Sequence, residues 1–484
     1  MPRAAEGPAL GARAAPVVAT LAVVAALATP VPSAAAADPP PPPDPIYRLR
    51  ITIRTTAREA RLRLNEPAIL VQGAVRGARG EARARWGAFG SGPLLLARRT
   101  GASRARSTFV VALTPAGAGR IRFISTKRGE GTTTIRVANL NRTPARPVVA
   151  VEHAGTRRRP VALSLAAVAA RGPVPGTEPL RPSVLAFYYP WYRRADWAGG
   201  KPIAGYNRIA EPYDSADPEV LDRHVAQARA AGLDGFLVSW WGQHIPYEGA
   251  VRALADRLPP DLSFALYVEL FSSQFRTEED LVRELDYALD TYAGSPRYLR
   301  LAGRPVLYAF STHNVLMDHG AGRHPDYEGV WRRVRAGLSA EGHDPVLVGE
   351  GRPFAPSDFG IFDGMHVYGT EDPSLTPARD REMSLTARAW AAVHGGLRRM
   401  WAASVLPGYD DRHILGREPD HFSRDDGRLY EGQWEAAIAS HSDQVLVVSF
   451  NEWMETTNIE PNTEWGTQYL DLTARLAGRF RQSR

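Results

Sequence analysis

Val447-Val-Ser-Phe-Asn-Glu-Trp-Met-Glu455 is the most informative segment of this 484-residue sequence. A mostly apolar run leads directly into two carboxylates, Glu452 and Glu455, with the amide of Asn451 and the indole of Trp453 beside them. A buried strand that ends abruptly in paired acids is typical of an α/β barrel, which carries its catalytic residues at its strand ends. A pair of carboxylates is also the set of catalytic groups that most glycosidases use, and aromatic residues beside them can bind the sugar.

The spacing of the two acids sets a condition on the backbone. In a continuing strand, Glu452 and Glu455 would point to opposite faces, because side chains alternate with a period of two. They can share one site only if the chain turns immediately after Phe450. The alternative is that acids three residues apart simply begin a solvated helix and favour its positive end. Spacing alone leaves both interpretations open.

From Ser183 onward the hydrophobic pattern switches repeatedly between strand and helix. Strands are expected at 184–189, 235–241, 263–270, 305–310, 345–349, 362–368, 400–406 and 444–450. Helices are expected at 218–231, 247–257, 278–291, 327–340, 378–393, 431–440 and 468–480, whereas 351–360 is too short for a full helix. Apolar strands alternating with helices predict a closed parallel (β/α)8 barrel for residues 182–484. An open doubly wound sheet is the alternative, but no glycine-rich phosphate loop follows the first strand.

Aromatic and acidic residues crowd the carboxyl ends of six of these eight strands. The segments concerned are Phe187–Tyr192, Ser239–Gly242, Tyr267–Glu269, His366–Tyr368, Pro407–Asp411 and Asn451–Glu455. Any single aromatic residue more often belongs to a core, because it buries a large area. Six such strand ends together favour a site for sugars, whose C–H faces pack on flat apolar rings while carboxylates bind the hydroxyl groups.

The sequence offers no recognisable metal or nucleophile motif. His366 and His394 lack partners at ligand spacing, and no HExxH segment occurs. No GxSxG turn indicates a serine nucleophile either. We therefore expect no metal site and no cofactor.

The pattern of the first 45 residues predicts a targeting signal followed by a spacer. Residues 1–37 have basic residues, an apolar run at 14–28 and small residues at 34–37, which is the order of a secretion signal with cleavage before Asp38. The proline-rich residues 38–45 predict a stiff spacer. The apolar run is shorter than the roughly 20 residues of a membrane span, although a retained anchor is the alternative. We expect a secreted or envelope-associated protein with no stable membrane span.

Residues 46–160 differ from the rest of the chain in charge. They hold 24 Lys and Arg against 5 Asp and Glu, a net charge of +19, whereas residues 161–484 have a net charge of −11. Short alternating stretches at 46–54, 60–64, 107–113, 120–125 and 132–138 predict a small all-β, sandwich-like domain of about seven strands. Residues 161–181, rich in proline and glycine, are expected to link it to the barrel.

Arginines occupy many of the outward positions in this basic domain. They are Arg48, Arg50, Arg54, Arg61, Arg63, Arg120 and Arg122. These side chains either face water in an accessory domain or bind an anionic cell-envelope polymer. Nucleic acid is not an expected partner, because the domain lacks the interleaved aromatic residues of single-strand binders.

Four motifs of the second half occur together in one known family. They are FYYPWY (187–192), GFLVSWW (235–241), FDGMHVY (362–368) and SFNEWMETTNIEP (449–461). With these, the chain resembles glycoside hydrolase family 99, the endo-α-mannosidase and endo-α-mannanase group, over about residues 183–475. The last motif is the most specific. Met454 and Thr456 depart from the residues usual in the family on either side of the second acid.

The resemblance implies a retaining reaction without a covalent enzyme intermediate, one of the exceptions to the usual scheme. In the family, the first acid removes the proton of the substrate's own 2-hydroxyl, whose oxygen attacks the anomeric carbon to give a 1,2-anhydro sugar. The second acid protonates the leaving oxygen. Glu452 is thus implied as the base and Glu455 as the general acid. Glu455 then needs a neighbour that raises its pKa, for which Glu452 and Trp453 are the candidates.

The same resemblance and the strand ends give an expected set of substrate-binding residues. They are Tyr189, Trp191, Trp241, Glu269, His366, Tyr368, Asn451 and Trp453. Tyr188 and Trp240 are alternatives to their neighbours, because the motifs leave one-residue shifts open.

The sequence as a whole predicts a secreted, retaining, endo-acting glycoside hydrolase whose partner is an α-mannan-like polysaccharide or glycan. One alternative is a glycosyltransferase-like protein of polysaccharide assembly, because the segment 460–466 also resembles a family-99-like domain found in such proteins. Another is a non-catalytic carbohydrate-binding protein of the envelope. The intact acid pair argues against it, since two neighbouring acids are costly to keep without a use.

Overall fold

The structure is a computed structural model. It describes residues 46–65, 68–71, 75–79, 81–85, 94–115, 120–140, 146–153, 159–164, 180–197, 209, 211–317, 322–351, 356–368, 376–394, 396–414 and 419–484. The expected signal and spacer lie outside these residues, as does most of the expected linker. In the part of the chain that the structure describes, no helix has both the length and the apolar character needed to cross a membrane.

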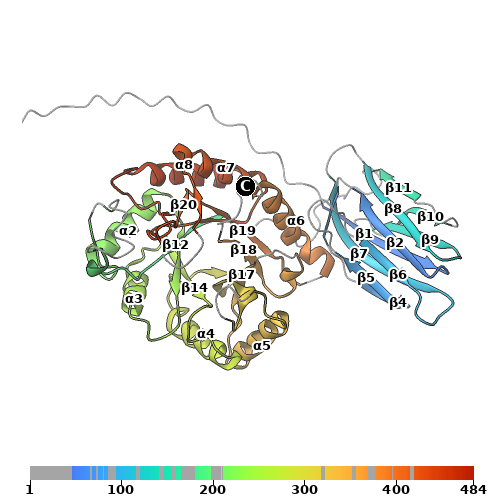
Figure 1. Cartoon of the computed structure of the whole chain (residues 1–484), viewed down its shortest axis with the longest axis horizontal. Coiled ribbons are helices and arrows are strands. Elements are labelled where there is room, and N and C mark those ends of the chain that lie inside the picture. The colour runs from blue at the N-terminus through green and yellow to red at the C-terminus, as the bar shows by residue number, and fades with distance from the viewer. Residues whose placement is uncertain are drawn as a thin grey trace, which may run out of the picture. The chain divides into compact units, whose positions relative to one another are not determined.

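The second half of the chain forms a closed parallel barrel of eight strands, so this prediction is confirmed (Figure 1). The strands are β12 (Ser183–Tyr188), β13 (Gly235–Trp240), β14 (Ser263–Glu269), β16 (Arg304–Phe310), β17 (Val346–Glu350), β18 (Gly364–His366), β19 (Met400–Val405) and β22 (Gln444–Val447). The ring runs β14-β13-β12-β22-β19-β18-β17-β16 and closes by a β14–β16 pairing. A two-residue strand, β15 (Arg300–Leu301), pairs antiparallel with β16 at its start.

Helices surround this barrel in the order that the hydrophobic pattern predicts (Figure 1). They are α2 (Pro218–Ala230), α3 (Glu248–Arg257), α4 (Glu278–Tyr292), α5 (Tyr327–Ala340), α6 (Thr376–His394), α7 (Arg428–Ala439) and α8 (Gln468–Gln482). The short connection between β17 and β18 holds only the 3-10 helix η4 (Pro356–Gly360), as expected from its length. Further short elements are η1 (Arg194–Trp197), η3 (Thr312–Asn314), η6 (Asp425–Gly427), and the pair β20 (Tyr409–Asp410) and β21 (His421–Phe422).

The barrel strands are apolar because both of their faces are covered. Every residue of β13 is buried, as is every residue of β14 after Ser263. Parallel strands covered on both faces read as continuous hydrophobic runs. The strands also approach closely: a Cβ on Gly235 would lie 2.1 Å from the Ser263 carbonyl oxygen. The absence of a side chain at Gly235 therefore permits the β13–β14 pairing.

Helix α4 shows how local sequence fixes an element. Thr277 accepts a hydrogen bond from the Asp280 amide, and the Asp280 carboxylate accepts one from the Thr277 amide. This reciprocal capping box satisfies two amide groups that the first turn leaves without partners. Three acids in that turn also favour the positive end of the helix dipole. The start of α4 is therefore encoded locally, and its apolar face packs on the barrel.

The described residues between 46 and 164 form two antiparallel sheets (Figure 1). One has the order β10-β9-β1-β7-β3 with β4 also paired to β7, and the other has the order β11-β8-β2-β6-β5. The strands are β1 (Tyr47–Thr55), β2 (Glu59–Asn65), β3 (Ala68–Val71), β4 (Val75–Arg79), β5 (Glu81–Arg85), β6 (Leu94–Arg98), β7 (Ala105–Pro115), β8 (Arg120–Arg128), β9 (Thr133–Asn139), β10 (Arg146–His153) and β11 (Arg159–Ser164). The described residues thus form eleven strands where about seven were expected, because several short strands lack clear alternation.

Alternation along β1 matches the prediction for a half-buried strand. Leu49, Ile51 and Ile53 are completely buried, whereas Arg50 and Arg54 are exposed. Arg48 and Arg61 are partly buried, and the side chains of Arg63, Arg120 and Arg122 lie outside the described set. The exposed arginines give this region its basic surface.

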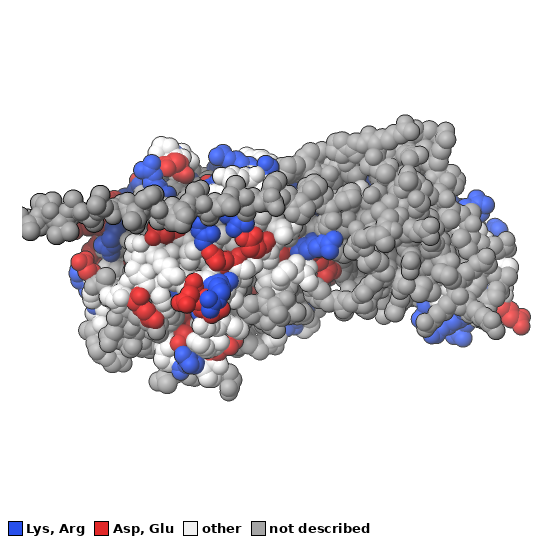
Figure 2. Space-filling model, turned by 90° about the horizontal axis from the view of Figure 1, so that it is seen from above, with Lys and Arg blue, Asp and Glu red and all other residues white. Residues whose placement is uncertain are grey.

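Charges on the barrel are mixed. On the face that Figure 2 shows, acidic and basic side chains of the barrel region lie interspersed. Exposed charges of the barrel form ion pairs, as Arg333 does with Glu278 at 2.7 Å and Arg229 with Asp261 at 2.9 Å. On the face shown in Figure 2 the acidic side chains therefore do not form one continuous patch.

Candidate active site

A cavity of about 370 Å³ opens at the carboxyl ends of the barrel strands. Its lining combines three carboxylates with seven aromatic rings: Tyr189, Trp191, Trp241, Tyr267, Glu269, Phe271, Phe310, Tyr368, Glu452 and Glu455. These residues come from the ends of β12, β13, β14, β16 and β18 and from the segment after β22. Apolar walls with a few convergent polar groups are typical of a site for a small organic ligand.

Glu452 and Glu455 share this cavity because the chain leaves the barrel wall after β22. The hydroxyl of Ser449 accepts a hydrogen bond from the Glu452 amide at 2.7 Å, and Thr456 adopts a left-handed conformation with φ of 56°. The Thr457 amide donates back to the Glu452 carbonyl oxygen at 3.2 Å. The turn between the two acids places both carboxylates on the cavity wall, which is the condition that the spacing sets.

Asn451 positions the first strand against this turn. Its side-chain oxygen accepts a hydrogen bond from the Tyr189 amide at 2.7 Å, and its side-chain nitrogen donates to the Tyr189 carbonyl oxygen at 3.0 Å. The Tyr192 hydroxyl donates to the Asn451 carbonyl oxygen at 2.9 Å and accepts from the Trp453 amide at 3.1 Å. Asn451 is completely buried and does not line the cavity, so it acts on the site through Tyr189.

Glu460 holds the far end of the same loop. Its buried carboxylate accepts hydrogen bonds from the Tyr213 hydroxyl at 3.0 Å and from the Trp453 indole nitrogen at 3.0 Å. The His224 Nε2 atom lies 2.9 Å from the other oxygen, and the Tyr188 hydroxyl lies 3.0 Å from His224 Nδ1. Such a fully connected polar network rigidifies the segment that contains it.

Burial dominates the electrostatics of the acids. Burial, and secondly the negative charge of Glu455, raises the pKa of Glu452 well above its usual range. Burial likewise raises the pKa of Glu269 to about 8, although the Ser239 hydroxyl donates to it at 2.8 Å and opposes the shift. Like charges that share a water-poor site cannot all ionise near neutral pH. The raised pKa values mean that Glu452 and Glu269 bind a proton more tightly than isolated glutamates do.

Two tyrosine hydroxyls complete the polar part of the cavity. Burial and the neighbouring carboxylates raise the pKa values of Tyr189 and Tyr368 well above their usual range, so both keep their protons. Tyr368 donates a long hydrogen bond of 3.4 Å to Glu455 Oε2. Tyr409 makes a similar contact of 3.4 Å with Glu455 Oε1 and donates to Asp411 at 2.9 Å. Glu455 is thus contacted by hydroxyl groups from two different strand ends.

The cavity brings together seven of the ten residues that the sequence selects. The other three, Asn451, His366 and Trp453, are buried away from it. His366 lies among the rings of Phe187, Tyr267 and Tyr308, and burial lowers its pKa to about 3. The indole nitrogen of Trp453 donates to Glu460 at 3.0 Å. The sequence could not show this, because adjacent residues of a turn point in different directions.

The structure also shows which residue of each adjacent aromatic pair, Tyr188–Tyr189 and Trp240–Trp241, lines the cavity. Tyr188 and Trp240 are completely buried, Tyr188 against His224 and Trp240 against Phe275. Tyr189 and Trp241 line the cavity instead. Three cavity residues, Tyr267, Phe271 and Phe310, are absent from the sequence-derived set. Phe310 ends a strand and Phe271 follows one, so the strand-end rule applied to all eight strands would have found them.

Most of the residues that line the cavity lie in a segment that matches the sequence profile of a known family. The sequence profile of glycosyl hydrolase family 99 matches residues 205–476, more than half of the chain. The chain belongs to glycosyl hydrolase family 99. The match includes both carboxylates of the pair, Glu452 and Glu455. It confirms the resemblance drawn from the four motifs.

Individual family 99 proteins are only distantly similar. The human glycoprotein endo-alpha-1,2-mannosidase-like protein is 26% identical over 311 residues, which are 56% of this chain and 63% of the human one. The mouse glycoprotein endo-alpha-1,2-mannosidase is 24% identical over 350 residues, 60% of this chain and 71% of its own. This chain thus spans less than two thirds of the human relative.

The solved family 99 endo-alpha-mannosidase of Bacteroides thetaiotaomicron shares the barrel. It superposes with a TM-score of 0.51 at 23% identity and covers 62% of this chain and 98% of its own. At this identity the likeness establishes the fold alone. The aligned part corresponds in length to the barrel half of this chain.

Proposed function

We propose that this protein is an endo-acting glycoside hydrolase that cleaves α-mannose-containing glycans by a retaining mechanism. The observation that carries the proposal is the placement of Glu452 and Glu455 on one aromatic-lined cavity. Membership of family 99 supports hydrolysis, and relatives that bear the name endo-alpha-mannosidase support the mannose substrate.

Sugar binding in this proposal uses the rings of the cavity. Trp191, Trp241 and Phe310 offer apolar faces, on which the C–H groups of a pyranose can pack. The indole nitrogen of Trp241 donates to the Ser239 hydroxyl at 3.1 Å, which in turn donates to Glu269. This chain of hydrogen bonds fixes the Trp241 ring and orients Glu269 toward the sugar hydroxyls.

The first chemical step transfers two protons in opposite directions. Glu452 takes the proton of the sugar 2-hydroxyl, and that oxygen forms a bond to the anomeric carbon as the glycosidic bond breaks. Glu455 gives its proton to the leaving oxygen, so that a 1,2-anhydro sugar and a free chain end result. The acid pair begins and ends with one proton, and its total charge is unchanged.

The second step reverses these roles. Glu455, now ionised, accepts a proton from a water molecule that attacks the anomeric carbon. Glu452 returns its proton to the 2-oxygen, and the anhydro ring opens. Two inversions at one carbon give net retention of configuration.

The burial of Glu452 supports its role as the base. A carboxylate whose pKa lies well above the usual range binds a proton more strongly, which favours proton removal from a weakly acidic hydroxyl. After burial, the negative charge of Glu455 is the second cause that raises the pKa of Glu452. Of the two neighbours expected to raise the pKa of Glu455, Glu452 lines the same cavity as Glu455.

The decisive experiment replaces Glu455 with Gln and measures turnover of an unactivated α-mannan or mannose oligosaccharide. Loss of general acid catalysis should lower kcat by about 10²- to 10⁴-fold while binding of the glycan remains. Glu435→Gln serves as a control, because Glu435 forms an exposed ion pair with Arg479 on the helices. Unchanged turnover in Glu455→Gln would overturn the proposal.

Product analysis separates the competing functions. New reducing ends from α-mannan support hydrolysis, whereas longer chains in the presence of acceptor sugars support a transferase. Binding without either product indicates a carbohydrate-binding protein. The 370 Å³ cavity with its acid pair favours the first result.

We further propose that the protein is exported and that its basic β-sheet region attracts an anionic envelope polymer. The support is the signal-like segment 1–37 and the exposed side chains of Arg50 and Arg54 within a region of net charge +19. Charges in 0.1 M salt act over about 10 Å, so such binding should weaken steeply as salt rises. Salt-independent binding, or none to purified anionic envelope glycans, would count against this role.

A further inference from the structure

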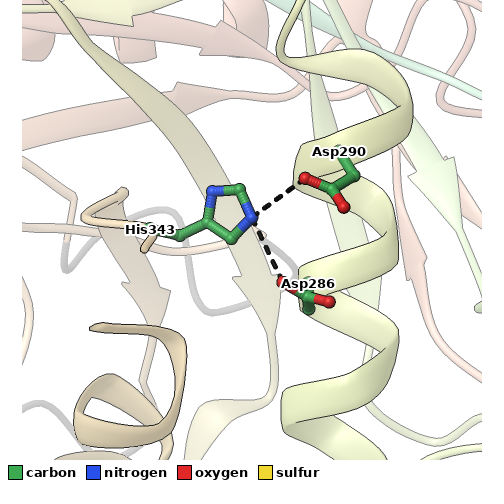
Figure 3. A group of neighbouring side chains, drawn as sticks. All are labelled: Asp286, Asp290 and His343. Atoms are coloured by element: carbon green, nitrogen blue, oxygen red, sulfur yellow. Dashed lines mark ion pairs between the residues drawn. The ribbon is translucent and has the colours of Figure 1, made fainter. Parts of the chain in front are cut away.

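Three side chains with metal-binding chemistry meet outside the cavity. Asp286 and Asp290 lie one turn apart on α4, and His343 points toward them from the turn between α5 and β17 (Figure 3). His343 Nε2 lies 3.1 Å from Asp286 Oδ1 and 3.2 Å from Asp290 Oδ1. All three potential ligand atoms lie within 4.8 Å of one another.

Rigid elements hold these side chains in place. Gly342 ends α5 in the left-handed conformation with φ of 95°, and the His343 amide donates to the Leu338 carbonyl oxygen at 2.8 Å. This is the hydrogen-bonding pattern of a glycine-terminated helix. The backbone of His343 is therefore fixed by the end of the helix, not by a free loop.

Close helix packing brings α4 to the same place. A Cβ on Gly337 would lie 2.7 Å from a Val282 methyl group, so the glycine lets α5 approach α4 closely. Asp286 and Asp290 follow Val282 at intervals of four residues and thus continue the same stripe of α4. Packing at Val282 therefore sets the distance between the two aspartates and His343.

We propose that Asp286, Asp290 and His343 form a binding site for a divalent transition-metal ion, with Zn²⁺ as the best-suited probe. Donors about 2.0 Å from a tetrahedral zinc ion lie roughly 3.3 Å from one another. The two Nε2–oxygen distances of 3.1 and 3.2 Å match two such edges. One imidazole with two carboxylates suits zinc and its neighbours better than calcium or magnesium, which prefer oxygen ligands alone.

The negative charge of the two aspartates also favours a divalent cation at this site. Two carboxylates at i and i+4 on one helix repel each other, and a divalent cation bound between them would relieve this repulsion. The site is accessible, since the side chains of Asp286, Asp290 and His343 are 30%, 72% and 21% exposed. Three protein ligands leave at least one position for water.

The place of the site in the barrel indicates a structural role. His343 precedes β17, which begins at Val346, so the site lies near the amino-terminal ends of the strands. The candidate active site lies at the opposite, carboxyl-terminal ends. That amino-terminal face of such barrels serves stability more than catalysis. A bound ion would clamp α4 to the end of α5.

The test uses the untagged full-length protein with ZnCl₂ as the probe, after treatment with a chelator. Calorimetric titration should show one site, and Zn²⁺ at about 100 times its Kd should raise the melting temperature by roughly 2 °C or more. His343→Ala and the surface substitution Asp290→Asn should each weaken Kd by about tenfold or more. His324→Ala, which removes a histidine elsewhere, should leave Kd unchanged.

Two results would overturn the site. Equal Zn²⁺ affinity in the wild type, His343→Ala and Asp290→Asn would assign binding to other groups. Failure of Zn²⁺ to bind or to raise the melting temperature would leave only an ion pair between His343 and the two carboxylates. Asp290→Asn keeps the test valid if His343→Ala does not fold, because Asp290 is mostly exposed.

Discussion

The hydroxyl oxygens of Tyr189 and Tyr368 lie 2.7 Å apart in the cavity. Tyr189 follows β12 and Tyr368 follows β18, two strands that are not neighbours in the barrel ring. Tyr368 also reaches Glu455 at 3.4 Å. The pair therefore links opposite parts of the cavity wall to the carboxylate proposed as the general acid.

Replacing Tyr368 with Phe should lower kcat about fivefold to tenfold with a smaller effect on KM. The substitution removes a hydrogen-bond donor from an ionisable partner, and the long contact places its effect at the low end of the range. Tyr189→Phe should lower kcat less than Tyr368→Phe does, because it leaves the Tyr368 hydroxyl able to donate to Glu455. Steady-state kinetics on a mannose oligosaccharide would measure both. Equal kcat for wild type and Tyr368→Phe would show that this hydroxyl does not act on catalysis.

Replacing Glu460 with Gln should destabilise the protein by about 2 kcal/mol or more and also lower activity. Tyr213 and Trp453 both donate to one oxygen of the buried carboxylate, whereas His224 Nε2 faces the other oxygen at 2.9 Å. An amide would replace the charged acceptor of two hydrogen bonds by a neutral one and would turn its NH2 group toward His224. Glu431→Gln is the matched control, since Glu431 pairs with Arg475 on the surface and should cost less than about 1 kcal/mol. Denaturant unfolding would compare them, and similar losses in the two variants would contradict the role of Glu460.

Glu269 should make stability fall as pH rises. Its pKa is raised from 4.5 to about 8, so between these pH values the folded protein holds a proton that the unfolded chain releases. Its contribution is fully present below pH 4.5 and is lost as pH rises through about 8. Melting temperatures of wild type and Glu269→Gln between pH 5 and pH 9 would measure this. The wild type should lose stability relative to the variant over that range, and parallel curves would refute the shift.

Gly235→Ala should destabilise the barrel by about 3 kcal/mol or more. The added Cβ would lie 2.1 Å from the Ser263 carbonyl oxygen, which belongs to the backbone of the neighbouring strand and cannot move away cheaply. Gly294→Ala is the control, because nothing lies within 4 Å of a Cβ at that position. Thermal unfolding of both variants would check the contrast. Similar melting temperatures would mean that β13 and β14 can separate without cost.

Much of the barrel could be predicted because its signals are local. All eight strands and seven helices lie within a few residues of their expected bounds, since covered parallel strands and amphipathic helices have different hydrophobic periods. The first half was predicted less well. Strands such as β4 and β5 are short and rich in Arg, Ala and Gly, so their alternation does not stand out from that of a loop.

The order of the barrel elements, the acid pair and the family could all be predicted from the sequence, because each depends on residues close together in the chain. Tertiary structure alone decided which of two adjacent residues faces the cavity, as for Tyr188 and Tyr189, since strand register and the turn after β22 set that direction. It alone placed His343 beside Asp286, 57 positions earlier in the sequence, because only the packing of α5 on α4 brings them together. Secondary structure can be predicted from the hydrophobic periodicity of the sequence. Contacts between side chains far apart in the sequence depend on how the helices and strands pack.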